Sequence, residues 1–197
     1  MENKVGRSIS EEEFQQYVHG RSSDATLSYF LNKQLTENEI MDLEEEKEKI
    51  YRSLCVGNPE FKLADGLTDF LDVLVEKNVP ITIATASALN NVKFFFEHLH
   101  MDKWFSLDKV AYNDGIIPGK PEPDLYLRAA EKINIDMNEC IVFEDAKSGI
   151  EAAQRAKVYK VIGVASMMSS EQLLELGVTA TICDYTNISD ILKLLSE

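Results

Sequence analysis

Short apolar runs rich in β-branched residues alternate with segments of helical periodicity along the last two thirds of the chain. A short, continuous apolar run is typical of a strand that is buried on both faces of a parallel sheet. Such runs predict strands at 79–84, 109–112 (the weakest), 140–143, 161–164 and 180–183. Helical spacing predicts helices at 67–76, 89–99, 124–133, 147–156, 171–176 and 188–195. Strands that alternate with helices predict an α/β fold, a three-layer sandwich around a parallel sheet.

The first part of the chain, up to Gly57-Asn58-Pro59, has helical patterns and no strand pattern. Two capping boxes predict helix starts, one with Ser10 and Glu13 and the other with Thr36 and Glu39. A further helix is predicted to start near Ser23 or Asp24. We therefore predict two domains, a small helical domain at 1–60 and an α/β core at 61–197.

The composition excludes several functional classes. The chain has 34 acidic and 20 basic residues, a formal net charge of -14, which repels a phosphate backbone and argues against nucleic acid as a partner. Cys55, Cys140 and Cys183 are far apart and include no C-x-x-C pair, which predicts neither a disulfide framework nor a zinc site and suits a reducing cytoplasm. No apolar run has the length of a signal peptide or membrane span, so we expect a soluble cytoplasmic protein with no membrane partner.

Polar residues that follow the predicted strands are the candidates for a site, because sites in open parallel sheets lie beyond the carboxyl ends of the strands. Thr85 and Ser87 follow the first strand, where hydroxyl and backbone N–H groups can donate to an anionic oxygen. The alternative is that a hydroxyl only caps the next helix. These residues alone leave both interpretations open.

Lys120 stands between Gly119 and Pro121 in the string G-K-P-E-P-D. This stiff, non-helical turn keeps its ammonium in one region, where it can neutralise both a carboxylate and a bound phosphate. The alternative is a solvated lysine in an ordinary helix-entry loop.

Glu144 and Asp145 end the strand at 140–143, and a turn of small residues leads into the next helix. Adjacent carboxylates repel each other and need a cation nearby, and Mg²⁺ suits them because it takes oxygen ligands. The alternative is that both acids only cap the helix that begins near Lys147, which the helix dipole would also favour.

The order of these features resembles the second, third and fourth motifs of the haloacid dehalogenase superfamily: a hydroxyl after a strand, a Lys-Pro turn, and Glu-Asp followed by S-G-I-E-A-A. The resemblance covers the chain from about residue 60 to its end. The helical part resembles the family's cap domain. Within it, His19-Gly20-Arg21-Ser22-Ser23 is similar to a cap stretch that faces the active site in the β-phosphoglucomutase-like branch. The resemblance implies a Rossmannoid core with a helical cap.

The same resemblance implies an enzyme, a phosphatase or hydrolase in which an aspartate attacks the phosphorus and forms an aspartyl-phosphate. Thr85 and Lys120 would then be catalytic residues that bind the transferring phosphoryl group. Glu144 and Asp145 would bind Mg²⁺, directly or through water. Ser87 would be a further phosphate contact.

One departure from the family is large. The first family motif, an apolar strand ending in D-x-D-G, should precede the cap, yet the chain contains no D-x-D string. Asp65-Gly66 and Asp114-Gly115 are out of place for it. We therefore expect the first core strand and the nucleophile to be missing, and the neighbouring strands to keep an unpaired edge. On this hypothesis the chain is a truncated form, by cloning, start assignment or biology, that begins at an internal methionine of a longer protein, and its catalysis is impaired.

Arg21 and Lys47 are candidate substrate contacts from the helical part, with solvated surface positions as the alternative. Phosphomutases of this branch are expected to have an arginine three residues after the glycine that matches Gly20, and this chain has Ser23 there. That difference favours a phosphatase of a small phosphorylated metabolite, such as a sugar phosphate, over a β-phosphoglucomutase-like phosphomutase.

Two rival classes use similar residues. A response-regulator receiver has its acidic pair early and its lysine last, whereas here the acids follow the lysine. A catalytically inactive family member that binds a ligand or partner is consistent with the absent D-x-D string, although Thr85, Lys120, Glu144 and Asp145 are all retained. Mg²⁺-dependent phosphate release would separate this last class from an enzyme.

Overall fold

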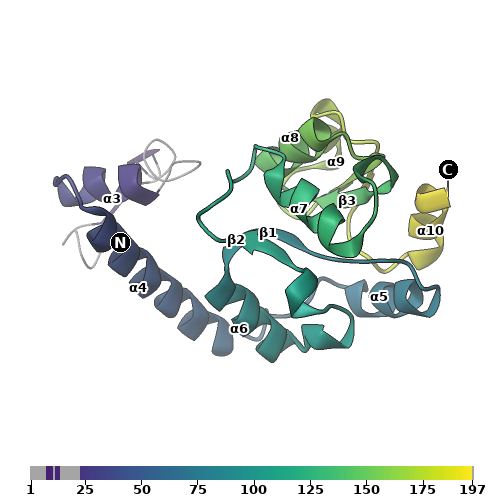
Figure 1. The fold of residues 1–197 in the computed structure, drawn as a ribbon, viewed down its shortest axis with the longest axis horizontal. Helices are drawn as coiled ribbons and strands as arrows, with labels where there is room; N and C mark the ends of the chain where they lie inside the picture. Colours follow the sequence, from purple (N-terminus) through teal and green to yellow (C-terminus); the bar gives the residue numbers. More distant parts are fainter. Residues whose placement is uncertain (1–7, 11, 14–22, 197) are drawn as a thin grey trace. The chain divides into compact units, whose positions relative to one another are not determined.

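The structure is a computed structural model that describes residues 8–10, 12–13 and 23–196 of the 197-residue chain. It divides into two compact units, Met1–Asn58 and Pro59–Glu197 (Figure 1). The helices of the first unit include α3 (Ser23–Leu31) and α4 (Glu37–Val56). The role of this unit as a cap domain stays a prediction.

Both predicted capping boxes are present in the first unit. The Ser10 hydroxyl accepts a hydrogen bond from the Glu13 amide at 3.1 Å, and the Glu13 carboxylate accepts one from the Ser10 amide at 3.4 Å. Thr36 and Glu39 exchange the same pair of bonds at the start of α4. Helix α3 starts at Ser23, which confirms that prediction.

Helices and parallel strands alternate in the second unit, which confirms the predicted α/β fold. The strands are β1 (Ala84–Ala88), β2 (Ala111–Asn113), β3 (Ile141–Glu144), β4 (Lys160–Val164) and β5 (Ala180–Ile182). The helices are α5 (Leu67–Glu76), α6 (Leu89–Leu99), α7 (Asp124–Ile133), α8 (Lys147–Ala156), α9 (Ser170–Glu175) and α10 (Ile188–Ser196). Short 3-10 turns occupy Met101–Lys103, Leu107–Lys109 and Met137–Glu139. Within the described ranges, no helix combines the length and apolar character needed to cross a membrane.

The strands form two sheets, β1-β2 and β3-β4-β5. Among the described residues no ladder joins β1 to β3, so each of these strands pairs on one side only. Helix α7 packs against β1 and β2 and also against α8, which itself packs against β3 and β4. One helical layer therefore spans both sheets, although their hydrogen bonding is interrupted.

The predicted strand at 79–84 is misplaced, because β1 begins only at Ala84. The residues before β1 form two isolated hydrogen bonds with the chain near β2. The Thr82 hydroxyl donates to the Lys109 carbonyl, and the Ala111 amide donates to the Ile83 carbonyl. A strand is defined by its ladder, and the ladder with β2 is short. The apolar run is exposed at Val79 and Pro80 and only partly buried beyond them, and its pairing with β2 starts at Ala84.

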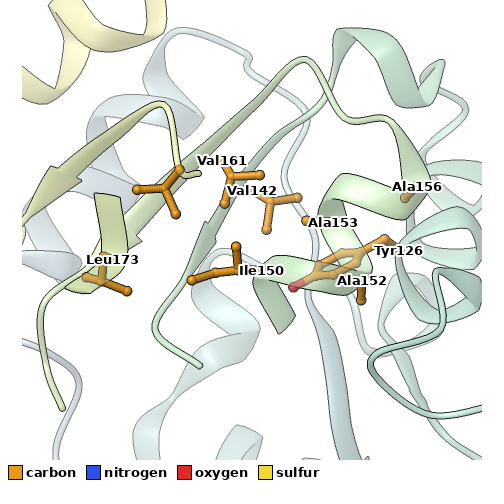
Figure 2. Packing of buried hydrophobic residues seen from close by; sticks show 9 residues of the cluster. Tyr126, Val142, Ile150, Ala152, Ala153, Ala156, Val161 and Leu173 are labelled. Carbon is orange, nitrogen blue, oxygen red and sulfur yellow. The ribbon is translucent and has the colours of Figure 1, made fainter. Parts of the chain in front are cut away.

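Successive residues of β3 pack into different cores on the two faces of its sheet. Val142 lies in a cluster with Tyr126 of α7, and with residues of α8 and α9 (Figure 2). Phe143 packs into the opposite cluster, where it meets Phe70 of α5, with ring centroids 5.7 Å apart, and residues of α10. Both faces of the sheet are covered, which gives the predicted three layers and leaves the residues after β3 at the edge of the sheet.

Candidate active site

Two acidic residues lie where β3 ends and the chain turns into α8. Strand β3 is held in register with β4, from the Ile141–Lys160 pair to the Glu144–Gly163 pair. Because the ladder runs to the last residue of the strand, Glu144 is fixed by backbone pairing and Asp145 is the first residue beyond it. The sequence prediction of acids at this strand end is therefore correct in position.

The Glu144 carboxylate is surrounded by donors. Its Oε2 accepts hydrogen bonds from the Lys120 ammonium at 2.7 Å and from the Tyr126 hydroxyl at 2.6 Å. Its Oε1 accepts the amides of Asp145 at 3.3 Å and Ala146 at 3.1 Å. A carboxylate offers about four acceptor sites, so these four donors account for them. Glu144 is 10% exposed and acts as an anchor for its neighbours.

Gly149 makes room for this carboxylate. A Cβ atom at this position would lie 2.0 Å from the Glu144 Cδ atom and 2.2 Å from its Oε2 atom, both far inside van der Waals contact. Gly149, in the first turn of α8, is therefore required by the close approach of Glu144 to this helix.

The charges in this cluster influence one another. Burial raises the pKa of Glu144, but the Lys120 ammonium and the hydrogen bonds outweigh it, so that the pKa lies below its ordinary value. Burial, followed by the negative charge of Glu144, raises the pKa of Tyr126 well above its ordinary range. Glu144 is therefore ionised, and Tyr126 donates its hydroxyl proton to it.

Asp145 differs from its neighbour, because it is exposed and has one bonded oxygen. The Ser166 hydroxyl donates to Asp145 Oδ2 at 2.8 Å. Asp145 Oδ1 has no hydrogen-bond donor in the part of the chain that the structure describes. The same part contains no group of three or more metal-binding side chains. Of the two adjacent acids, Asp145 is thus the one with a carboxylate oxygen available to a ligand.

Lys120 is held in place by two neighbours. Its ammonium binds Glu144 and lies 4.7 Å from the centre of the Tyr126 ring, a cation–π distance. The side chain is 13% exposed, which excludes the alternative of a solvated surface lysine. Glu144 is the one hydrogen-bond partner of this ammonium among the described residues, and an ammonium has three donors. Donor capacity therefore remains for an anion.

Thr85 and Ser87 lie half-buried on β1. The Thr85 hydroxyl accepts a hydrogen bond from the Ser87 amide at 3.1 Å. Neither residue caps α6, whose N-cap position is Ala88 and has no side-chain cap. In the described structure no hydrogen bond links Thr85 or Ser87 to Lys120, so their role in a common site stays a prediction.

The alternative interpretation, in which Glu144 and Asp145 only cap helix α8, is only partly correct. The N-cap residue of α8 is Ala146, and it has no side-chain cap. Glu144 does accept the Ala146 amide at the entrance to the helix. Its shorter hydrogen bonds, however, go to Lys120 and Tyr126, which come from a different part of the chain.

The two predicted substrate contacts lie in the first unit or outside the described residues. Lys47 is on α4, is largely exposed, and forms an ion pair with Glu48 at 2.8 Å. Arg21 lies outside the described residues, as does most of the cap-like stretch around it. Both stay predictions as substrate contacts.

Sequence reasoning missed Tyr126 and Ser166. Ser166 follows β4, so the strand-end rule that selected Thr85 and Asp145 could have found it. Tyr126 gave a weaker signal, because its position on α7 is that of a core residue. Only the structure shows that its hydroxyl reaches Glu144.

Comparison with known proteins identifies the family. Residues 1–164 match the profile of the haloacid dehalogenase-like hydrolases. A phosphorylated carbohydrates phosphatase of Thermotoga maritima is 30% identical over 166 residues, which are 84% of this chain and 71% of that protein. A β-phosphoglucomutase of Mycobacterium bovis is 26% identical over 130 residues, which are 65% of this chain and 49% of that protein.

A solved structure agrees with this result. The crystal structure of a HAD hydrolase of family IA, variant 3, from Entamoeba histolytica is 35% identical to this chain. The match has a TM-score of 0.90 and covers all of this chain and 88% of the other. Fold and relatives agree, and the chain belongs to the haloacid dehalogenase-like hydrolases, in the branch of phosphatases and β-phosphoglucomutases.

Proposed function

We propose that this chain carries the phosphate- and Mg²⁺-binding part of a phosphatase that acts on small phosphorylated metabolites such as sugar phosphates. The observation that carries the proposal is the buried pair of Lys120 and Glu144 beside the open carboxylate of Asp145. It places one partly satisfied cation and one available acid at the same end of a parallel sheet.

The chemistry of phosphoryl transfer requires such an arrangement. Negative charge spreads over the phosphoryl oxygens, and the protein contributes chiefly by positioning and charge neutralisation. Lys120 would bind one of these oxygens with the donors that Glu144 leaves unused. Since Glu144 holds the ammonium from one side, little reorganisation is needed when the anion arrives.

The acids suit Mg²⁺, although they differ in role. Mg²⁺ is commonly held by one or two carboxylates, with waters and substrate phosphate completing its coordination. Asp145 would be the direct ligand through Oδ1, and Glu144, whose acceptor sites are filled, would contribute through water or through its charge. A bound Mg²⁺ would offset the charge on the phosphate oxygens.

The remaining predicted residues have supporting roles in this proposal. Thr85 would donate its hydroxyl to the transferring phosphoryl group, with Ser87 as a second contact. Arg21 and Lys47 would bind the rest of the substrate from the helical unit.

The substrate class is supported by the relative from Thermotoga maritima, named for its action on phosphorylated carbohydrates. A β-phosphoglucomutase-like phosphomutase is the second candidate, supported by the mycobacterial relative. The presence of Ser23, in place of the arginine expected of a mutase, favours the phosphatase. A ligand-binding family member without turnover is the third possibility.

We also propose that a chain of this sequence is impaired in turnover. It contains no D-x-D string. Glu144 is fully hydrogen bonded, and the open oxygen of Asp145 is assigned to the metal, so neither acid is placed to attack phosphorus. Among the described residues β1 and β3 each keep an unpaired edge, which supports the proposal that a strand is missing between them.

The test is Mg²⁺-dependent phosphate release from p-nitrophenyl phosphate and a panel of sugar phosphates, with intact mass confirmed. Lys120→Ala should lower any activity by about 100-fold or more, because it removes a preorganised charge. The matched control is Lys147→Ala, which removes an exposed lysine paired with Glu151 at 3.8 Å and should leave activity unchanged.

The outcomes separate the proposals. Activity that Lys120→Ala abolishes supports the phosphatase and contradicts the impairment. A second outcome is that no protein releases phosphate, yet inorganic phosphate binds in the presence of Mg²⁺ and Lys120→Ala weakens this binding. That outcome supports the site together with the impairment. Absence of both release and binding would refute the phosphatase site.

A further inference from the structure

We infer that Tyr126 is a positioning residue that shares the Glu144 carboxylate with Lys120 and so keeps part of the Lys120 ammonium available for an anion. The inference rests on the proposed function insofar as that anion is the phosphate of a substrate. The geometry on which it depends, however, belongs to the described residues alone.

Tyr126 contacts both members of the ion pair. Its hydroxyl donates to Glu144 Oε2 at 2.6 Å, the oxygen that also accepts the Lys120 ammonium at 2.7 Å. Its ring lies under the same ammonium, 4.7 Å away. One side chain thus fixes the carboxylate through its polar end and the ammonium through its aromatic face.

The hydroxyl is the important group because it occupies an acceptor site that the lysine would otherwise fill. Glu144 Oε2 has two donors, one neutral and one charged. Without the hydroxyl, Oε2 would be one donor short in a buried position, which is unfavourable. The ammonium has spare donors, so it would turn further toward Glu144 and away from an incoming anion.

The ring of Tyr126 is itself immobilised by the core. Tyr126 is 5% exposed and belongs to the cluster that contains Ile150, Ala152 and Ala153 of α8. Figure 2 shows the ring among these side chains, with its hydroxyl oxygen directed toward the Ile150 side of the cluster. A phenylalanine would keep this packing and the contact with the ammonium, and would lose the hydroxyl alone.

Tyr159 provides a matched control. The Lys160 ammonium lies 4.8 Å from the centre of its ring, much as Lys120 lies over Tyr126. The Lys160 ammonium donates to the Leu194 carbonyl and has no carboxylate partner among the residues that the structure describes. Tyr159→Phe therefore removes a tyrosine hydroxyl beside a lysine without touching a shared acid.

The first experiment measures proton exchange of lysine ammonium groups by ¹H–¹⁵N NMR, with the Lys120 signal assigned by its absence in Lys120→Ala. Tyr126→Phe should slow exchange at Lys120 by about three- to tenfold, the change expected from one hydrogen bond of ordinary net strength. Exchange at Lys160, which is also buried, should not change. Tyr159→Phe should leave the Lys120 signal as it is in the wild type.

The second experiment measures binding of inorganic phosphate by calorimetry in the presence of Mg²⁺. Tyr126→Phe should weaken binding by about three- to tenfold, because the ammonium is held more tightly by Glu144. In the Lys120→Ala background the same substitution should have no further effect, since Tyr126 acts through Lys120.

Unchanged or faster exchange at Lys120 in Tyr126→Phe would overturn the inference. Faster exchange at both Lys120 and Lys160 would mean that the hydroxyl serves only the stability of the fold. Slower exchange at Lys120 in a protein that binds no phosphate would uphold the shared carboxylate, and the proposed phosphatase site would fail on its own.

Discussion

The two parallel sheets of the second unit differ in how their pairing fixes the residues at the strand ends. Strands β3, β4 and β5 pair in continuous register. Strands β1 and β2 pair at Ala84–Ala111 and at Ala88–Asn113, so β1 has two more residues than β2 between the same two pairs. The carboxyl end of the three-stranded sheet, where Glu144 and Asp145 lie, is thus an ordered rim. The carboxyl end of the two-stranded sheet, where Thr85 and Ser87 lie, is an irregular rim.

This difference separates the candidate site into two parts. Glu144 and Asp145 follow a regular strand, and Glu144 is fixed by four donors. Thr85 and Ser87 lie in the irregular segment of β1 and are bonded to each other. The acids and Lys120 are therefore preorganised, and the hydroxyls are the part of the site whose geometry is least determined by pairing.

The largest effect is expected from the core under the three-stranded sheet. Leu173 of α9 is 0% exposed and lies 3.2 Å from the position of a Cβ atom on Gly163 of β4. Leu173→Ala should lower the free energy of unfolding by about 3 kcal/mol, through lost burial and a cavity. Urea denaturation measures this value. The neighbouring Leu174→Ala, at a position that is 51% exposed, should change it by less than about 0.5 kcal/mol, and equal losses would contradict the assigned core.

Gly149→Ala tests how firmly Glu144 is held at the ordered rim. The added methyl group would collide with a carboxylate that cannot move without giving up its donors, so we expect a loss of about 2 kcal/mol in the free energy of unfolding. Gly57→Ala is the control, because a Cβ atom there has no heavy atom within 4 Å. If both variants unfold at the same urea concentration, the Glu144 carboxylate can move away from the added methyl group and is not fixed by its donors.

The sequence predicts the regular sheet better than the irregular one. The predicted strands at 140–143, 161–164 and 180–183 each lie within one residue of β3, β4 and β5. The run at 79–84 is also mostly apolar, yet it precedes β1 and overlaps it at Ala84 only. A hydrophobic pattern cannot report whether a neighbouring strand is present to form a ladder.

The candidate site was predictable to the extent that it depends on strand ends. Lys120, Glu144 and Asp145 are placed by turns and strand termini that have clear sequence signals. Tyr126 could not be predicted as a site residue, because a tyrosine on the buried face of α7 is indistinguishable from an ordinary core residue until its hydroxyl partner is known.

A smaller effect is expected where the segment before β1 is attached. The Thr82 hydroxyl donates to the Lys109 carbonyl at 2.7 Å, which supplements the short ladder between β1 and β2. Thr82→Val keeps the branched shape and should cost about 1 kcal/mol, the net value of one hydrogen bond. The control is Thr181→Val on β5 of the regular sheet, which removes a hydroxyl that has no hydrogen bond among the described residues. Urea denaturation should show a smaller loss in the free energy of unfolding for Thr181→Val than for Thr82→Val. A reversed order would mean that the ladder alone holds β1.

The smallest effect concerns alkaline pH and the charge at the ordered rim. Burial first, and then the negative charges of Asp145 and Glu144, raise the pKa of Tyr185 to about 12. Because this pKa is raised on folding, its contribution to stability is complete below the ordinary tyrosine value near 10 and is lost as the pH rises from there toward 12. At pH 10.5 the wild type should have lost about 0.8 kcal/mol through this residue. Urea denaturation at pH 8 and pH 10.5 with EDTA should show the loss, and Tyr185→Phe should reduce it. An equal loss in Tyr185→Phe would show that the titration of Tyr185 does not cause it.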